Sequence, residues 1–170
     1  AEGCDVFFSP VSIEAAQLII DQAVAQNVDF PLLAGDTWDT GVVLQAAKGK
    51  NVDITVTTFY PEGANAEFDE GFKGWLNANP SMLANNGGDT VISAVSAMGY
   101  DSYFVALEAL KAAGSTDSAK VMEALWNVKY EGVSGPIAFD AVNGDAIRNT
   151  AFVKHANTEN GSWDALPAVS

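Results

Sequence analysis

Two carboxylates and an indole ring lie close together in the segment Gly35–Thr40, the part of the sequence best suited to chemistry. Asp36 and Asp39 are three residues apart, with Trp38 between them. Such a pair could contact a ligand, take part in acid–base catalysis, or hold a metal ion if further ligands joined it. A second interpretation is structural: Asp36 or Thr37 caps the following helix and Trp38 packs locally. The residues alone leave both interpretations open.

The sequence lacks the further residues that catalysis or metal binding would require. The chain has one histidine, His155, one cysteine, Cys4, and no calcium-loop pattern of alternating acids. Gly132–Gly135 lacks the spacing of a nucleophile elbow, and Asn85–Asp89 matches no nucleotide fingerprint. We therefore predict a protein that is not an enzyme, with no catalytic residue, no metal and no cofactor. His155 is interpreted as structural or surface, and Cys4 as a small buried residue.

The charge balance excludes several classes of partner. Eight lysines and arginines stand against 22 acidic residues, a formal net charge of −14. Binding to nucleic-acid phosphates or to anionic lipid is therefore not expected. No apolar stretch approaches the roughly 20 residues of a membrane span. The 170 residues are 48% hydrophobic, enough for one ordinary core but short for two complete domains. The sequence does not open with a signal segment, so either one was removed or the sequence begins inside a longer protein. We expect the second, because the opening residues are typical of the end of a helix that leads into a strand.

The first 60 residues alternate between short apolar runs and helical patterns. A helix is expected to begin with Ser9 as its N-cap and Pro10 at its first position. This order of strands and helices with short connections predicts a parallel sheet with right-handed crossovers, an α/β fold. The predicted strands are residues 5–8, 30–34 and 53–58, and the second helix is Gly41–Ala47.

Polar loops follow each of these predicted strands. In a parallel sheet, the loops at the carboxyl ends of the strands gather at one edge, where ligands bind. Here the loops are Ser9–Ser12, Gly35–Thr40 and Phe59–Glu62. Their hydroxyl, carboxylate and aromatic groups could contact a polar ligand with an apolar tail.

After Glu62 the pattern becomes helical, and short strands return near the end. The tail, residues 157–170, is polar and is expected to lie on the surface with Trp163 as its only large anchor. The predicted helices are residues 66–77, 89–113 and 116–127, the last capped by Thr116, and the predicted strands are residues 137–139 and 150–155.

Several segments, taken in order, resemble the leucine/isoleucine/valine-type periplasmic binding proteins, which have the type I binding-protein fold. Their order and spacing over almost all of the 170 residues carry the resemblance. The segments are Cys4–Phe8, Glu14–Ile20, Leu33–Asp39, Met98–Asp101, Tyr130–Asp140 and Asn143–Asp145.

The resemblance implies two α/β lobes with doubly wound, flavodoxin-like parallel sheets, which close on a ligand about a hinge of three crossing segments. The chain would be an incomplete version of this two-lobe fold. Residues 1–58 would form the latter part of the second, C-terminal lobe, and residues 59–62 a hinge crossing. Residues 63–148 would form the latter part of the first, N-terminal lobe, and residues 149–170 the hinge return and the C-terminal segment of the second lobe.

The resemblance also implies a binding site. In this family the acidic residue after the Leu-Ala-Gly strand binds the ligand's α-ammonium group, and that role falls on Asp36. The loop after the first strand supplies an aromatic ring in relatives, but the aligned position here is Val11 or Ser12. This departure leaves the apolar contact and the ligand's identity open. The predicted ligand-binding residues are Asp36, Trp38, Val11, Ser12 and Tyr60.

The function implied by the resemblance is capture of an amino acid, hydrophobic or branched-chain, for the permease of an ABC transporter. The location would be periplasmic or extracellular, with the full-length protein tethered to the membrane. Two alternatives belong to other classes. One is a ligand-binding sensory receptor domain, and the other is a carboxylate-assisted hydrolase that uses Asp36 and Asp39.

The resemblance further implies that the N-terminal half of the protein is missing from this sequence. Two half-built lobes would expose sheet edges and apolar faces. We therefore expect the chain to pair with the missing half, or with a second copy of itself by exchanging elements. Size-exclusion chromatography with light scattering should give a species larger than the 17.8 kDa of one chain. A stable, folded monomer of that mass would contradict the prediction.

Overall fold

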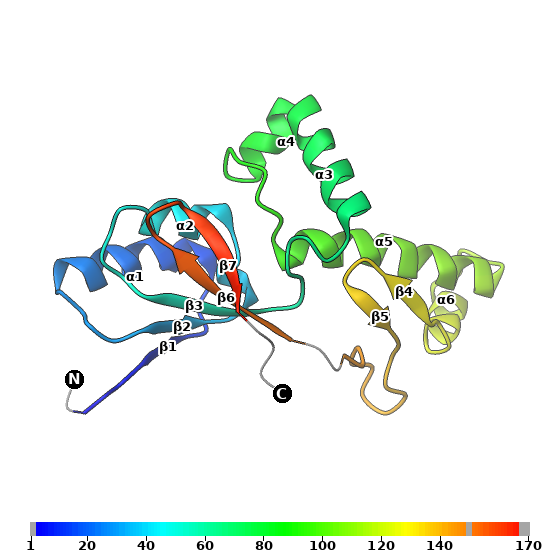
Figure 1. Cartoon of the computed structure of the whole chain (residues 1–170). Coiled ribbons are helices and arrows are strands. Elements are labelled where there is room, and N and C mark those ends of the chain that lie inside the picture. Colours follow the sequence, from blue (N-terminus) through cyan, green and yellow to red (C-terminus); the bar gives the residue numbers. More distant parts are fainter. Residues whose placement is uncertain (1–2, 149–150, 167–170) are drawn as a thin grey trace. The chain divides into compact units, whose positions relative to one another are not determined.

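The computed structural model describes residues 3–148 and 151–166 (Figure 1). The chain divides into two compact units, Ala1–Ala94 with Ala151–Ser170 and Val95–Thr150, and each is described by itself. The lobe boundaries expected from the sequence, at residues 58, 62 and 148, stay predictions. Among the described residues, no helix has both the length and the apolar character needed to span a bilayer.

A five-stranded sheet forms the centre of the first unit, in the order β1-β2-β3-β6-β7. The first three strands are parallel, as the sequence predicts, while β6 runs antiparallel to β3 and β7 antiparallel to β6 (Figure 1). The sheet is thus mixed but mostly parallel at the end that carries the predicted loops. The strands are β1 (Phe7–Ser9), β2 (Leu32–Ala34), β3 (Ile54–Thr58), β6 (Phe152–Asn157) and β7 (Ser162–Leu166).

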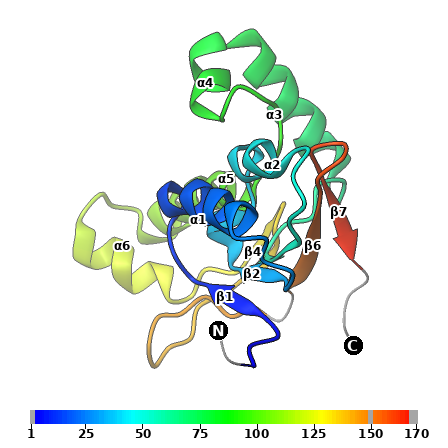
Figure 2. The same cartoon turned by 90° about the vertical axis from the view of Figure 1, so that its left-hand side faces the viewer.

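Helices α1 (Ile13–Ala25) and α2 (Gly41–Ala47) connect the parallel strands and pack side by side on the sheet (Figure 2). Ile20 on α1 is fully buried, together with Ile54 and Val56 on β3. These residues belong to one core cluster that also contains the neighbouring side chains of β2 and α2. Burial of this apolar stripe, the main favourable term in folding, therefore fixes the two helices on the sheet.

Three details at the start of the chain differ from the sequence-based prediction. Ser9 is not the helix cap, because it is the last residue of β1 and three residues outside any helix or strand separate it from α1. The N-cap of α1 is Ser12, and the helix begins at Ile13. Cys4 was predicted to be buried, but it is exposed because it precedes β1.

The described part of the C-terminal tail lies at the surface, as predicted, and Trp163 anchors it by packing against the core of the first unit. Its strand β7, which pairs in register with β6, was not predicted. The predicted strand 150–155 corresponds to β6, which runs to Asn157, while Thr150 and residues 167–170 lie outside the described residues.

The segment after β3 contains α3 (Ala66–Ala78), as predicted, and α4 (Pro80–Asn85), which was not predicted. Asn65 caps α3 by accepting a hydrogen bond from the backbone N–H of Phe68. The next helix was expected from residue 89, but it begins at Ala94. Asp89 instead accepts a hydrogen bond from the backbone N–H of Val91, which holds this stretch in a loop.

The second unit has a small core beneath the long helix α5 (Ala94–Ala113). The core consists of Val105, Ala109, Val128 and Ile137. Asp117, not the predicted Thr116, caps α6, and β5 lies two residues earlier than the predicted strand. The remaining elements of this unit are α6 (Ser118–Leu125), β4 (Tyr130–Gly132) and β5 (Gly135–Ile137).

A buried carboxylate holds the turn between β4 and β5. Asp101, on α5, accepts hydrogen bonds from the backbone N–H groups of Val133 and Ser134, each at 2.8 Å, and from the Ser134 hydroxyl. Arg148 donates to the carbonyl oxygen of Ser134 at 3.1 Å. A Cβ atom at Gly132 would lie only 2.4 Å from an oxygen of Asp101, so a glycine is required there.

Replacement of Gly132 tests this close approach. We expect Gly132→Ala to lower the free energy of unfolding by about 1–3 kcal/mol, because the added methyl group displaces the buried carboxylate. Gly99→Ala is the matched control, since a Cβ there meets nothing within 4 Å beyond its own helix. The control should raise stability by about 0.5–1 kcal/mol. Urea unfolding followed by circular dichroism measures both, and equal effects of the two changes would contradict the prediction.

Candidate ligand-binding site

The carboxyl ends of β1, β2 and β3 lie at one edge of the sheet, because these strands pair in parallel. The first two loops at this edge are joined by hydrogen bonds to a single carbonyl oxygen. The Thr37 hydroxyl donates to the Val11 carbonyl at 3.2 Å, and the Trp38 indole N–H donates to it at 3.1 Å. The structure therefore brings Val11 together with the segment that contains Asp36.

Asp36 opens a single turn of 3-10 helix, η1 (Asp36–Trp38), directly after β2. Its side chain is partly exposed, and none of the described residues forms a hydrogen bond or ion pair with its carboxylate. The cap of α2 is Thr40, whose side chain accepts a hydrogen bond from the backbone N–H of Val43. The interpretation that Asp36 or Thr37 caps this helix is therefore wrong.

Asp39 has the opposite environment, since its side chain is fully buried. The Lys154 ammonium group lies 2.9 Å from both of its oxygens and is itself buried. The Thr58 hydroxyl donates to Asp39 at 2.6 Å and the backbone N–H of Ala94 at 3.2 Å. An ionised carboxylate in an apolar interior requires such partners, because burial without them is very costly.

The two carboxylates therefore cannot act as an acid–base pair on a ligand. Asp39 is engaged by three donor groups and has no exposed surface, whereas Asp36 is partly exposed. Within residues 3–148 and 151–166, no group of three His, Cys, Asp or Glu side chains could hold a metal ion. The segment Gly35–Thr40 therefore offers one available carboxylate, Asp36, which suits a cationic group.

The other predicted site residues differ in how deeply they are buried. Trp38 is fully buried, so it supports the Val11 loop through its indole N–H. Val11 is 38% exposed and Ser12 is exposed at the start of α1. A hydrogen bond from the Ser12 side chain lowers the pKa of Glu14, which is also exposed. The Val11 carbonyl thus lies beside the turn that contains Asp36, while the Ser12 side chain bonds to Glu14 in the first turn of α1.

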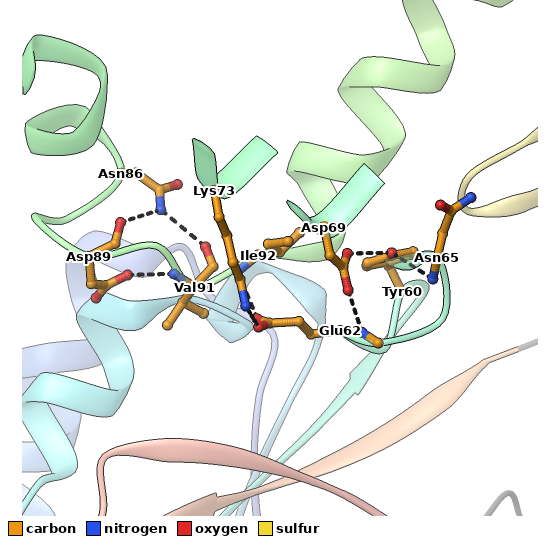
Figure 3. A network of polar contacts seen from close by, with 10 residues as sticks. Tyr60, Glu62, Asn65, Asp69, Lys73, Asn86, Asp89, Val91 and Ile92 are labelled. Carbon is orange, nitrogen blue, oxygen red and sulfur yellow. Dashed lines mark hydrogen bonds and ion pairs between the residues drawn. The ribbon is translucent and has the colours of Figure 1, made fainter. Parts of the chain in front are cut away.

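Tyr60 follows β3 but points into a buried network (Figure 3). Its hydroxyl donates to Asp69 at 2.6 Å and accepts from the backbone N–H of Asn65 at 3.2 Å. Burial raises the pKa of Tyr60, and the Asp69 carboxylate raises it further. Asp69 also accepts from the backbone N–H of Gly63 at 2.6 Å. Tyr60 therefore ties α3 to the loop after β3, and its contact with a ligand stays a prediction.

Besides the Tyr60 and Asp69 contacts, the network in Figure 3 contains an ion pair between Lys73 and Glu62. Lys73 on α3 pairs with Glu62, whose other oxygen accepts a hydrogen bond from the backbone N–H of Ile92 at 3.2 Å. These bonds hold the loop after β3, α3 and the segment before α5 together. Because both side chains are about one-third exposed, the pair contributes less than the buried pair of Asp39 and Lys154.

Lys154 is the residue that the sequence-based analysis missed. No role was predicted for it, whereas its neighbour His155 lies 3.0 Å from Asp53 at the surface, as interpreted. One signal was present: Lys154 lies two residues before Ala156, so both side chains lie on the same face of the strand, and this face is the buried one. A lone lysine on the buried face of a strand requires an acidic partner.

Comparison with known proteins adds a family match. A model described as periplasmic binding protein matches residues 1–161. Among solved structures, the chain is similar to a leucine-binding protein from Thermotoga maritima, at 28% identity and a TM-score of 0.70. That alignment covers 96% of this chain and 44% of the other. No curated protein has a matching sequence.

Two further structures have the same fold at lower identity. A solute-binding protein of an ABC transporter from R. palustris, in complex with benzoate, is 19% identical with a TM-score of 0.69, over 95% of this chain and 42% of that one. The branched-chain amino acid transporter substrate-binding protein of Streptococcus pneumoniae, in complex with isoleucine, is 22% identical with a TM-score of 0.68, over 97% and 44%. The chain thus spans less than half the length of all three structures.

The hydrogen bond from Trp38 to Val11 can be tested by a change that keeps an aromatic ring. Trp38→Phe should lower the free energy of unfolding by about 2 kcal/mol, because it removes a buried donor and leaves a small cavity. Trp75→Phe, at a site 49% exposed, is the control and should change stability by less than about 0.5 kcal/mol. Urea unfolding measures both variants. A loss at Trp38 no larger than in the control would show that the indole does not support this loop.

Proposed function

The chain belongs to the periplasmic binding protein family, with the mostly parallel α/β sheet of the type I fold, and we propose that it captures an amino acid for an ABC transporter. In this proposal it acts outside the cytoplasm, and its macromolecular partner is the permease. The observation that carries the proposal is the contrast between Asp36 and Asp39. Asp39 is buried and paired with Lys154, whereas Asp36 stays available at the edge of the sheet where the loops meet.

Asp36 would bind the ammonium group of the ligand. A charge-assisted hydrogen bond between a carboxylate and an ammonium group contributes about 1.5–3 kcal/mol, more than a neutral hydrogen bond. Because no described side chain competes for the Asp36 carboxylate, ligand binding there has to break no existing ion pair. The free carboxylate therefore favours a ligand with a positively charged group, such as the α-ammonium group of an amino acid.

Val11 and Ser12 would contact the rest of the ligand, with Trp38 holding their loop in place. Val11 presents a branched apolar side chain, which suits an aliphatic ligand. The three solved structures contain or are named for leucine, isoleucine and benzoate, all with an apolar part and a carboxylate. Benzoate has no ammonium group, so a role for Asp36 distinguishes an amino acid from a simple carboxylate ligand.

Binding without turnover is the proposed mode of action. A hydrolase that uses both Asp36 and Asp39 is disfavoured, because Asp39 already bonds to Lys154 in the interior. A sensory receptor domain would use the same site and remains the second candidate. A membrane span and a signalling domain on the same polypeptide would favour it. We also propose that the missing half of the fold, or a second copy of the chain, supplies the other wall of the site.

The role of Asp36 is tested by titrating the chain with leucine, isoleucine and benzoate in a calorimeter. Asp36→Asn keeps the shape of the side chain but removes its charge, so binding of the two amino acids should weaken about tenfold or more. Binding of benzoate should not weaken. Asp29→Asn, also at an exposed acid, is the matched control and should bind like the unchanged protein.

Thermal unfolding gives a second readout, since a ligand that binds only the folded state raises the melting temperature. Leucine or isoleucine should raise it for the unchanged chain and for Asp29→Asn, but not for Asp36→Asn. Equal amino-acid affinity in both variants would sink the assignment of Asp36. Hydrolysis of an amide or ester that is lost in Asp36→Ala would instead favour the enzyme.

A further inference from the structure

The Asp39 carboxylate collects donors from three segments that are distant in the sequence. Thr58 is the last residue of β3, and Ala94 is the last residue of the first unit before the chain enters the second. Lys154 lies just after the chain returns to the first unit at Ala151. One buried side chain therefore bonds next to both connections between the units.

Asp39 also lies in the same short segment as Asp36. The backbone N–H groups of Trp38, Asp39 and Thr40 donate to the carbonyl oxygens of Gly35, Asp36 and Trp38, at 3.1, 3.0 and 2.8 Å. These bonds make the segment a tight turn, with little freedom for Asp36 to move when Asp39 is held. The orientation of the exposed acid thus depends on the anchoring of the buried one.

We propose that Asp39 and Lys154 are positioning residues, which fix the Asp36 turn and couple it to the chain connections beside the second unit. The ammonium group of Lys154 is the central element, because it bonds to both oxygens of Asp39 and sets the direction of the carboxylate. The ligand part of this inference rests on the proposed function. The anchoring of the turn does not, so the two can fail separately.

Three variants separate positioning from general stability. Lys154→Met removes the charge but keeps an unbranched side chain, and it leaves Asp39 buried without a counterion. If that variant fails to fold, the double variant Asp39→Asn with Lys154→Met removes both charges at similar volume, which buried pairs often tolerate. Lys154→Arg restores the cation. Lys50→Met, which breaks the exposed pair of Lys50 with Asp21, is the matched control.

Hydrogen exchange of individual backbone amides, followed by NMR, is the decisive measurement. In Lys154→Met, or in the double variant, the amides of Trp38, Thr40 and Ala94 should exchange about tenfold faster or more, since their local anchoring is lost. The amide of Leu32, which donates to Asp53 inside the sheet, should change little. Lys154→Arg should restore slow exchange in part, and Lys50→Met should leave all four amides unchanged.

Exchange that rises equally at Leu32 and at the turn would show a purely structural role and overturn the proposal. So would unchanged exchange at Trp38 and Thr40. In the ligand arm, leucine binding should weaken in the variants that lose the charge pair, with partial recovery in Lys154→Arg. If the unchanged chain binds no amino acid, the proposed function fails, while the exchange data still decide whether Asp39 and Lys154 anchor the turn.

Discussion

The buried ion pair between Asp39 and Lys154 is the constraint on which the first unit depends. Its partners are 115 residues apart in the sequence, so the pair forms only when β6 returns to the sheet. It also fixes the register of that strand, because Lys154 lies opposite Val56 on β3. A shift of one residue would turn the ammonium group to the other face and leave a buried carboxylate without a counterion.

Each of three buried acids in this strongly acidic chain joins different elements in a different way. Asp39 has a counterion, while Asp69 relies on the Tyr60 hydroxyl and a backbone N–H group. Asp101, in the second unit, relies on two backbone N–H groups and the hydroxyl of Ser134. A carboxylate is costly to bury, so it stabilises only the arrangement in which every one of its oxygens has a hydrogen-bond donor. These carboxylates thus determine loop geometry at positions where apolar packing alone would allow several arrangements.

The sequence predicts best where apolar periodicity is local. The three parallel strands, α1, α2 and α3 follow from short-range patterns, and the edge that gathers the loops follows from strand direction. The sequence predicts poorly those strands and side-chain contacts whose partner lies far away along the chain. Strand β7 is short and none of its residues is buried, so its place in the sheet depends on its pairing with β6. The contact between Lys154 and Asp39 could not be placed from sequence spacing, although a lysine on an apolar strand indicated that some acid must meet it.

The unequal environments of Asp36 and Asp39 explain how one six-residue segment can serve both the fold and a ligand. By residue type and place in the sequence the two acids look alike, and only the family resemblance singles out Asp36. The 3-10 turn ends at Trp38, and its C-cap Asp39 has a ψ of 70°, which breaks the helical path before α2 begins. That break directs one carboxylate to the interior, where Lys154 neutralises it, and leaves the other at the rim of the sheet. Because Lys154 already satisfies the interior acid, this segment leaves one carboxylate at the rim. One carboxylate suits the proposed ammonium group better than a divalent metal ion, which takes several oxygen ligands.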